Sequence, residues 1–156
     1  MASSAVSADE VLEKKFHIRF KNKALLEEAL THKSYAMEQG GMPFNERLEF
    51  LGDSVFNTVI AAHLFGRYPD VDEGKLSKLK SQLVARQSLL TWGKEIKVAA
   101  LLKLSESEEM TGGRERESLI ANVMEALIGA IFLDLGFETA REFILKHYGK
   151  KKNVNG

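Results

Sequence analysis

Three carboxylates share one side of a segment that is otherwise apolar. The stretch NERLEFLGDSVFNTVI covers residues 45–60, and a helix that turns by about 100° per residue places Glu46, Glu49 and Asp53 within an arc of roughly 60°. Carboxylates this close repel one another unless solvent or a cation separates them. Phe56 continues the same side with a large apolar group, so a cleft that holds a cation fits this segment better than an open acidic surface.

A second apolar segment, SLIANVMEALIGAIFLD, raises the same question because it contains Asn122 and Glu125. Residues three apart are neighbours on one face of a helix. Ser118, Ala126 and Gly129 flank them with small side chains, which allows another helix to approach closely. An ionised glutamate in such surroundings is costly unless it is paired or bound to a metal, so Glu125 is expected to have a positive partner.

Joined together, the two segments offer a set of oxygen ligands: Glu49, Asp53, Glu125 and the side-chain carbonyl of Asn122. Oxygen ligands of this kind suit Mg²⁺ or Mn²⁺. Zinc fits poorly, because the chain has no cysteine and its 4 histidines lack zinc-ligand spacing. A cation held there would orient phosphate oxygens and activate water for in-line attack. Two alternatives stay open, a solvated acidic face and an ion pair of Glu125 with Arg114 or Arg116.

Phe50 lies beside the carboxylates, at about 40° from Glu46 around the helix axis, and away from the apolar stripe of the same helix. That stripe consists of Leu48, Leu51, Val55 and Val59. An aromatic group in this position either packs into the core of its own chain or anchors a contact with a second subunit.

These segments belong to a chain in which helical spacing dominates. We find 2 prolines, no alternating strand, no internal repeat and no interior linker. Helices are expected over residues 7–16, 22–34, 45–68, 75–91, 92–102, 118–135 and 138–151. Ser7 or Asp9 is a suitable N-cap for the first helix, and Asn22 is one for the second. Polar or glycine-bearing loops are expected over 35–44 and 105–117. The pattern predicts an all-α fold.

Length and composition bound the class of protein. The chain of 156 residues is long enough for one domain with a hydrophobic core. Lys+Arg and Asp+Glu both number 22, so contact with a polyanion must use local positive charge or bound cations. The absence of cysteine excludes disulfides. The start MASSAVSADE lacks the features of a secretory signal, and no apolar stretch of about 18 residues is free of charge, so we expect a cytoplasmic protein without membrane contact.

The motif NERLEFLGDSV resembles the signature of the ribonuclease III family, the Mg²⁺-dependent endonucleases that cut double-stranded RNA. LLEEALTHKSY, YPDVDEGKLSKLKSQLV and RESLIANVMEALIGAIFLD resemble further family motifs in the family's order, so the likeness covers about Val11 to Tyr148. It implies a ribonuclease III endonuclease-domain-like helical fold over residues 1–149, followed by a basic tail or linker over 150–156. Bacterial members usually add a double-stranded RNA-binding domain. This sequence is then either a natural short form or one that ends at the linker to such a domain, and the Lys/Asn/Gly composition of the tail favours the linker.

The resemblance also assigns roles to residues. The metal ligands would be Glu49, Asp53, Asn122 and Glu125, with Asp53 and Glu125 as catalytic residues. Glu46 and Glu73 would be acidic neighbours that help to bind metal or to position RNA and water. Phe50 would insert into a socket on the partner subunit of a homodimer. Each subunit would cut one strand and leave 5′-phosphates with short 3′ overhangs, in the processing of rRNA or mRNA precursors.

A-form RNA is contacted mainly through its phosphates, its 2′-hydroxyls and its shape. We expect the basic segment GKLSKLKSQLVAR to provide such contacts through Lys75, Lys78, Lys80 and Arg86. A solvated helix face is the alternative for each of them. His32 is interpreted as structural, because nothing near it in the sequence equips it as a catalytic base. Tyr35 and Trp92 are interpreted as core residues rather than platforms on which RNA bases stack.

Asn122 departs from the family pattern, which usually has an aspartate three residues before its last ligand. The amide oxygen can still coordinate, but one negative charge is lost, so weaker Mg²⁺ affinity is expected. This departure keeps open a second hypothesis, a catalytically silent relative that binds structured RNA or belongs to a ribonucleoprotein. A third is an all-α nucleotide pyrophosphohydrolase, which also uses ExxE pairs around Mg²⁺, although the order ExxExxxD … NxxE fits it poorly.

Overall fold

The computed structural model describes residues 7–149, and in this part of the chain the regular elements are helices. One isolated bridge joins Thr31 and Lys103. The all-α prediction is confirmed, whereas the predicted tail over 150–156 lies outside the described residues. In chain order the elements are α1 (Ala8–Phe16), α2 (Lys23–Ala29), α3 (Lys33–Glu38), α4 (Glu46–Arg67), α5 (Glu73–Leu83), α6 (Arg86–Glu95), η1 (Val98–Leu101), α7 (Glu106–Met110), η2 (Gly113–Glu115), α8 (Glu117–Leu135) and α9 (Phe137–Tyr148), where η marks a 3₁₀ helix.

Side-chain caps set the starts of several helices. Ser7 begins α1 with a capping box, in which its hydroxyl accepts the backbone N–H of Glu10 at 3.2 Å and the Glu10 carboxylate accepts the backbone N–H of Ser7 at 3.2 Å. Asn22 caps α2 as predicted, by accepting the backbone N–H two residues later at 3.0 Å. Asp72 caps α5 in a similar way at 2.9 Å, so this helix begins two residues earlier than predicted.

The single helix predicted over 22–34 is wrong, because the chain leaves the helix after α2. The hydroxyl of Thr31 donates to the carbonyl oxygen of Glu27 at 2.6 Å, and Thr31 then pairs with Lys103. His32 caps the new helix α3, which occupies the first part of the loop predicted over 35–44. Lys103 is remote in sequence, so a local pattern carries no sign of this break.

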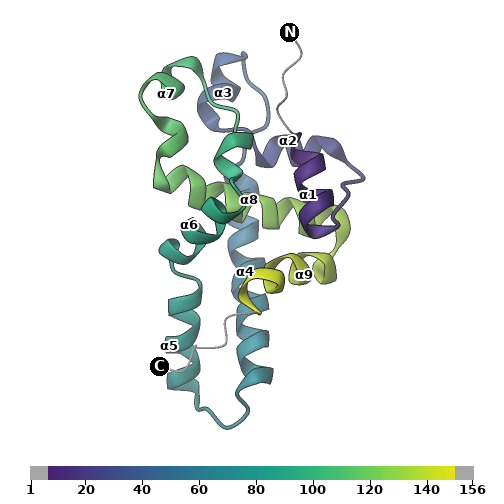
Figure 1. The fold of residues 1–156 in the computed structure, drawn as a ribbon, viewed down its shortest axis with the longest axis vertical. Coiled ribbons are helices and arrows are strands. Elements are labelled where there is room, and N and C mark those ends of the chain that lie inside the picture. Colours follow the sequence, from purple (N-terminus) through teal and green to yellow (C-terminus); the bar gives the residue numbers. More distant parts are fainter. Residues whose placement is uncertain (1–6, 150–156) are drawn as a thin grey trace.

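The helix predicted over 75–91 is also two helices, α5 and α6. Ala85 between them is extended, with a ψ of 150°, and neither glycine nor proline marks the position. The change of direction lets α6 pack against α8 (Figure 1). The piece predicted over 92–102 is the end of α6 followed by η1. Part of the polar loop predicted over 105–117 is helical, since Ser105 caps the short helix α7 at 3.1 Å.

The helix α8 is the central element of the fold. It packs against α2, α4, α6 and α9, and Figure 1 shows it crossing α4 near the middle of the molecule. By length and hydropathy alone Glu117–Leu135 is able to cross a membrane. Here its apolar side chains are buried among the surrounding helices, so it is the core helix of the fold.

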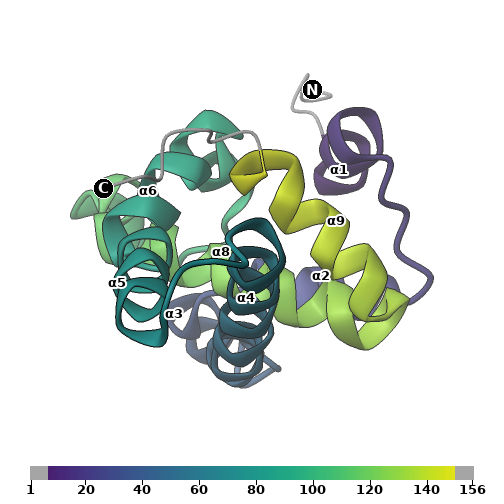
Figure 2. The same cartoon turned by 90° about the horizontal axis from the view of Figure 1, so that it is seen from below.

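The helices α4 and α5 form a hairpin that extends away from the rest of the molecule (Figure 1). Figure 2 views the same hairpin from below, with α4 and α5 side by side. Lys80 on α5 donates to the side chain of Asn57 on α4 at 3.2 Å. The first half of α4 therefore belongs to the core with α8, whereas its second half forms one side of the projecting hairpin.

Candidate metal centre

Two glycines allow α4 and α8 to cross in direct backbone contact. A Cβ atom at Gly52 would lie 1.7 Å from the carbonyl oxygen of Glu125, and one at Gly129 would lie 2.3 Å from the carbonyl oxygen of Leu48. No side chain larger than a hydrogen atom fits at either position. The expectation that small residues let another helix approach is confirmed at Gly129. Its counterpart Gly52 was not singled out from the sequence, although a glycine inside an apolar helix is unfavourable and so is a signal in itself.

The crossing brings the predicted ligands of both helices together. Glu49 and Asp53 stand on either side of Gly52 along α4. Asn122 and Glu125 lie on the part of α8 that faces them, and both are half-buried. The pKa of Glu125 is raised to about 8, chiefly by burial. A hydrogen bond with Asp53 and the negative charges of Asp53 and Glu49 add to this shift. Asp53 and Glu125 therefore share one site, although they are far apart in sequence.

Positive charge reaches the site from Arg86, at the start of α6. Its Nη1 donates to Oδ1 of Asn122 in a long contact of 3.5 Å, and its charge acts to lower the pKa of Glu49 and of Glu125. For Glu49 the pKa is still raised, because burial and the charges of two nearby carboxylates outweigh Arg86. One guanidinium group thus offsets the carboxylates only in part, which leaves the site favourable for a further cation.

The alternative that Glu125 forms an ion pair with Arg114 or Arg116 is wrong. Arg114 pairs with Glu109 and donates to two backbone carbonyl oxygens at 2.7 and 2.8 Å. Arg116 pairs with Glu108 at 2.6 Å. Both arginines are engaged around α7, so they do not neutralise Glu125.

The chemistry of this donor set fits a hard divalent cation. Carboxylate and amide oxygens are ligands that Mg²⁺ and Mn²⁺ prefer, and a cation would relieve the repulsion that helps to raise the pKa of Glu125 to about 8. Within residues 7–149, no group of three His, Cys, Asp or Glu side chains is yet placed to hold a metal ion. Because the two helix backbones are already in contact, a ligand cage requires rotation of side chains rather than movement of helices.

Two small cavities open beside these residues. The first, of about 220 Å³, is lined by Glu46, Glu49 and Asn122 together with His32, Asn45, Leu102 and Leu119. The second, of about 190 Å³, is lined by Arg86 and Glu125 together with Val84, Leu89 and Ala121. The structure thus places Glu46, predicted as an accessory acidic residue, in the same cavity wall as two of the predicted ligands.

Glu73 is not brought to this site within its own chain. It begins α5 at the far end of the hairpin, where it lines a groove with Leu64 and Phe65 of α4. Phe65 follows Asp53 by 12 residues on one helix, which corresponds to about 18 Å along the axis. An accessory role for Glu73 beside the ligands of the same chain is therefore not supported by the geometry.

Phe50 projects from α4 with 80% of its surface exposed, so the alternative that it packs into its own core is wrong. It borders an open hollow of about 670 Å³, which is lined by Leu25, Glu28, Glu46, Arg47, Leu48, Leu51 and Leu133. An exposed aromatic group next to a partly apolar hollow is typical of a contact surface.

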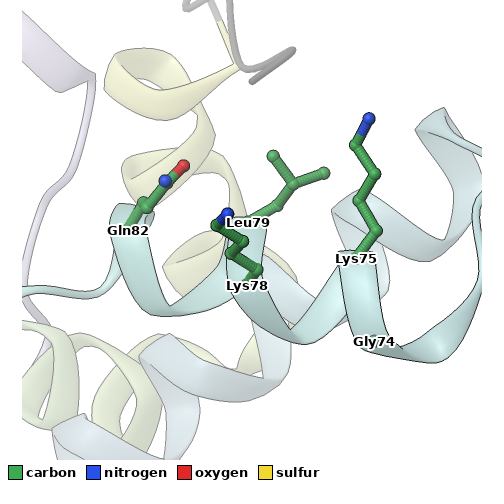
Figure 3. Close-up of a pocket in the computed structure, with 5 residues that line it drawn as sticks. All are labelled: Gly74, Lys75, Lys78, Leu79 and Gln82. Carbon is green, nitrogen blue, oxygen red and sulfur yellow. The ribbon is translucent and has the colours of Figure 1, made fainter.

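The four basic residues predicted to contact RNA separate into two groups. Lys75 and Lys78 extend from the same side of α5 and line an open hollow with Gln82 (Figure 3). Lys80 is instead half-buried against α4, and Arg86 reaches the carboxylate site. A role for Arg86 close to the carboxylates was not foreseen from the sequence, because it depends on the break between α5 and α6.

His32 and Trp92 both make the structural contacts expected from the sequence. Nδ1 of His32 accepts the backbone N–H of Ser34 at 3.1 Å and so caps α3. Trp92 is buried, with its ring 5.4 Å from that of Tyr148. Tyr35 is half-buried, with the ammonium group of a lysine 6.0 Å from its ring.

Comparison with known sequences agrees with this arrangement. The family model described as Ribonuclease-III-like matches residues 22–152. Ribonuclease 3 from Clostridium tetani is 49% identical over 137 residues, which cover 88% of this chain and 58% of that protein. Ribonuclease 3 from Bordetella petrii is 49% identical over 137 residues, covering 88% of this chain and 52% of that protein. This chain therefore spans little more than half the length of these relatives.

Solved structures show the same fold. The nuclease domain of ribonuclease III from Campylobacter jejuni matches with a TM-score of 0.82 and 39% identity, covering 90% of this chain and 93% of that one. A second structure of that domain, concerned with flexibility in the region involved in its dimer formation, matches with a TM-score of 0.81, 39% identity and coverage of 90% and 98%. Dicer from Pichia stipitis gives a TM-score of 0.63 at 27% identity, over 87% of this chain and 61% of that one.

The described helices thus form an all-helical nuclease-domain fold, with a carboxylate site where two of its helices cross. The chain belongs to the ribonuclease III family. Membership of this family excludes the nucleotide pyrophosphohydrolase that remained as an alternative from the sequence.

Proposed function

We propose that this chain is the nuclease domain of a Mg²⁺-dependent endoribonuclease that cleaves double-stranded RNA. The products would carry 5′-phosphates and short 3′ overhangs, and the substrates would be rRNA and mRNA precursors. The observation that carries this proposal is the crossing of α4 and α8 through Gly52 and Gly129, which sets acidic side chains of both helices side by side. The relatives named ribonuclease 3 support it.

The residues proposed to hold the cation are Glu49, Asp53, Asn122 and Glu125. When bound there, Mg²⁺ supplies the charge that polarises a phosphate oxygen and lowers the pKa of a water molecule, and Mn²⁺ is expected to replace it because it takes the same ligands. Glu125, whose pKa is raised to about 8 by its surroundings, gives up its proton so that its carboxylate can serve as a ligand. Arg86 stays beside Asn122, where its guanidinium group can attract a phosphate of the backbone.

A homodimer would suit a duplex substrate, because two equivalent sites can meet two strands of the same geometry. Phe50 and the adjoining hollow lie on one face of the molecule, so each subunit offers both a projecting aromatic group and a place to receive one. Lys75 and Lys78 are proposed to contact RNA phosphates from the exposed side of α5. Lys80 and Arg86 are less suited to that surface because they face α4 and the carboxylate site.

The decisive experiment measures cleavage of labelled duplex RNA and of a nucleoside triphosphate, each with Mg²⁺ and with EDTA. We expect cleavage of the duplex alone, and only with Mg²⁺. Replacing Glu125 by Gln should reduce this cleavage by more than about 100-fold, since it removes a ligand rather than a group that merely orients one. Glu117→Gln is the matched control, because Glu117 is an exposed carboxylate on the same helix and should be replaced without loss.

The same assay tests the catalytically silent relative that Asn122 left open. A silent relative would bind duplex RNA equally well with Mg²⁺ and with EDTA and would leave it intact. If the wild-type chain binds but does not cut at any Mg²⁺ concentration, the nuclease proposal is overturned in favour of that alternative.

A further inference from the structure

His32 lies in a part of the backbone that several hydrogen bonds hold in place. Its N–H donates to the carbonyl oxygen of Lys103 at 3.0 Å, and the N–H of Lys103 donates to the carbonyl oxygen of Leu30 at 2.8 Å. On the other side, the N–H of Asn45 donates to the carbonyl oxygen of Thr31 at 2.9 Å. These bonds join three separate segments of the chain next to the start of α4, so the position of His32 relative to that helix is well defined.

The hydrogen bonds of the imidazole ring decide which nitrogen carries the proton. Nδ1 accepts the backbone N–H of Ser34 at 3.1 Å and lies 2.8 Å from its Oγ. That Oγ accepts the backbone N–H of Ser105 at 3.0 Å, which leaves its own proton free to point at Nδ1. Nδ1 is therefore an acceptor, and in the neutral ring the proton is on Nε2. Partial burial lowers the pKa of His32, which favours this neutral form.

The opposite edge of the ring is turned away from the cap. His32 lines the cavity of about 220 Å³ together with Glu46, Glu49 and Asn122. Among residues 7–149, none accepts a hydrogen bond from Nε2. A water molecule takes about 30 Å³ in the liquid, so the cavity has room for several, with carboxylate and amide oxygens to bind them.

Capping alone does not require a histidine at this position. Serine, aspartate or asparagine caps a helix at least as well, and each is smaller. What the imidazole adds is a second polar edge, with a donor nitrogen, on a residue that lines the same cavity as two of the predicted ligands.

We propose that His32 is a positioning residue for the metal centre, whose Nε2–H donates to water in this cavity and thereby holds the carboxylates of Glu46 and Glu49 in the orientation that serves a divalent cation. This inference rests on the proposed function, because it needs a cation at the carboxylate site. It gives the loop before α4 a role in metal affinity as well as in folding. Groups that orient ligands in this way commonly change metal affinity by about 10- to 100-fold.

Two substitutions separate the two edges of the ring. His32→Asn keeps an acceptor near Nδ1 and removes the Nε2 donor, whereas His32→Gln places an amide N–H near Nε2 and weakens the cap. Mg²⁺ binding is measured by isothermal titration calorimetry, and stability by thermal unfolding in EDTA. We expect His32→Asn to unfold near the wild-type temperature but to bind Mg²⁺ roughly tenfold more weakly. His32→Gln should unfold at a lower temperature and bind Mg²⁺ close to the wild-type affinity.

A spectroscopic readout does not depend on either variant. The ¹⁵N NMR spectrum of the wild-type protein should show the Nε2-protonated tautomer of His32 at neutral pH, and Mg²⁺ should shift the signal of Nε2 more than that of Nδ1. Wild-type Mg²⁺ affinity in His32→Asn overturns the inference, and so does an equal loss of affinity in both variants. If the wild-type chain binds Mg²⁺ but leaves duplex RNA intact, the proposed function fails while the comparison of binding still tests His32. If the wild-type chain does not bind Mg²⁺, both fall.

Discussion

Burial and two neighbouring carboxylates act on Glu125 in the same direction, and the charge of Arg86 acts against them. A carboxyl group with a pKa of about 8 holds its proton at pH 7 in most molecules. The metal-free protein thus keeps a proton at the place where we propose a cation. Binding of the cation must release this proton, so metal affinity should increase as the pH rises toward 8.

The raised pKa of Glu125 also predicts how the metal-free protein responds to pH. Because the folded-state pKa of about 8 is above the ordinary value of 4.5, the contribution of this group to stability is fully present below pH 4.5 and is lost as the pH rises toward 8. Glu125→Gln removes this loss. In EDTA at pH 8 the variant should be more stable by about 1 kcal/mol, a figure reduced for the partial exposure of the group.

The measurement for Glu125→Gln is thermal or urea unfolding in EDTA at pH 5 and at pH 8. The variant should gain stability at pH 8 and little at pH 5, and Mg²⁺ should stabilise the wild-type protein more than the variant. A gain of equal size at both values of pH would show that the charge of Glu125 is not its cause.

Asn122 is the second residue with a specific expectation. Replacing it by Asp adds one negative charge at a predicted ligand position, so the Mg²⁺ concentration for half-maximal cleavage should fall by about tenfold. Gln87→Glu is a suitable control, because it adds the same charge at an exposed position on α6. An unchanged Mg²⁺ dependence of Asn122→Asp would remove Asn122 from the set of ligands.

At the scale of elements, the crossing of α4 and α8 depends on the absence of side chains at two positions. Gly52→Ala would place a methyl group 1.7 Å from the carbonyl oxygen of Glu125, so the helices must separate. We expect a loss of about 3 kcal/mol or more in the free energy of unfolding, measured by urea denaturation. Gly66→Ala is the matched control on the same helix, because nothing lies within 4 Å of the added methyl group. It should be neutral or stabilise by about 0.5 kcal/mol. Equal stabilities of the two variants would contradict the close crossing.

The elements that could be predicted from the sequence are those fixed by local signals. The cap at Asn22 and the apolar stripes of α4 and α8 act within a few residues, and the structure contains them. The break at Thr31 is different, because it depends on a bridge to Lys103. The break at Ala85 depends on the packing of α6 against α8, with no glycine or proline to announce it.

The candidate site follows the same division. Charge and spacing predicted which carboxylates belong together on α4 and that Asn122 neighbours Glu125 on α8, because both properties are local. That α4 and α8 meet at Gly52 is a fact of tertiary packing. Two further features depend on how α5 and α6 are arranged in space and could not be obtained from sequence spacing. Arg86 lies beside Asn122, and Glu73 lies far from the other acidic residues.

At the scale of the whole molecule, two exposed phenylalanines on α4 allow the dimer to be tested. Phe50 is 80% exposed and Phe65 is 75% exposed, but only Phe50 borders the hollow beside the carboxylate site. Phe50→Ala should weaken association by about 2 kcal/mol or more, as expected for an aromatic anchor at the centre of an interface. Phe65→Ala is the control and should associate like the wild-type chain. The measurement is sedimentation equilibrium over a range of protein concentrations.

Two results would count against Phe50 as the anchor. One is association of Phe50→Ala with wild-type affinity, and the other is an equal weakening by Phe65→Ala. In the second case the surface of the hairpin, rather than the face beside the carboxylates, would be the contact.

The direct contact of two backbones at Gly52 and Gly129 also bears on how this protein can evolve. A layer of side chains between helices can be replaced step by step, and each replacement moves the helices slightly. This crossing has no such layer, so mutations elsewhere in the interior have little means of shifting one set of carboxylates relative to the other. Adaptation to a different ion must then proceed by exchange of the donor side chains themselves, and Asn122 marks a position where such an exchange alters the charge without altering the size.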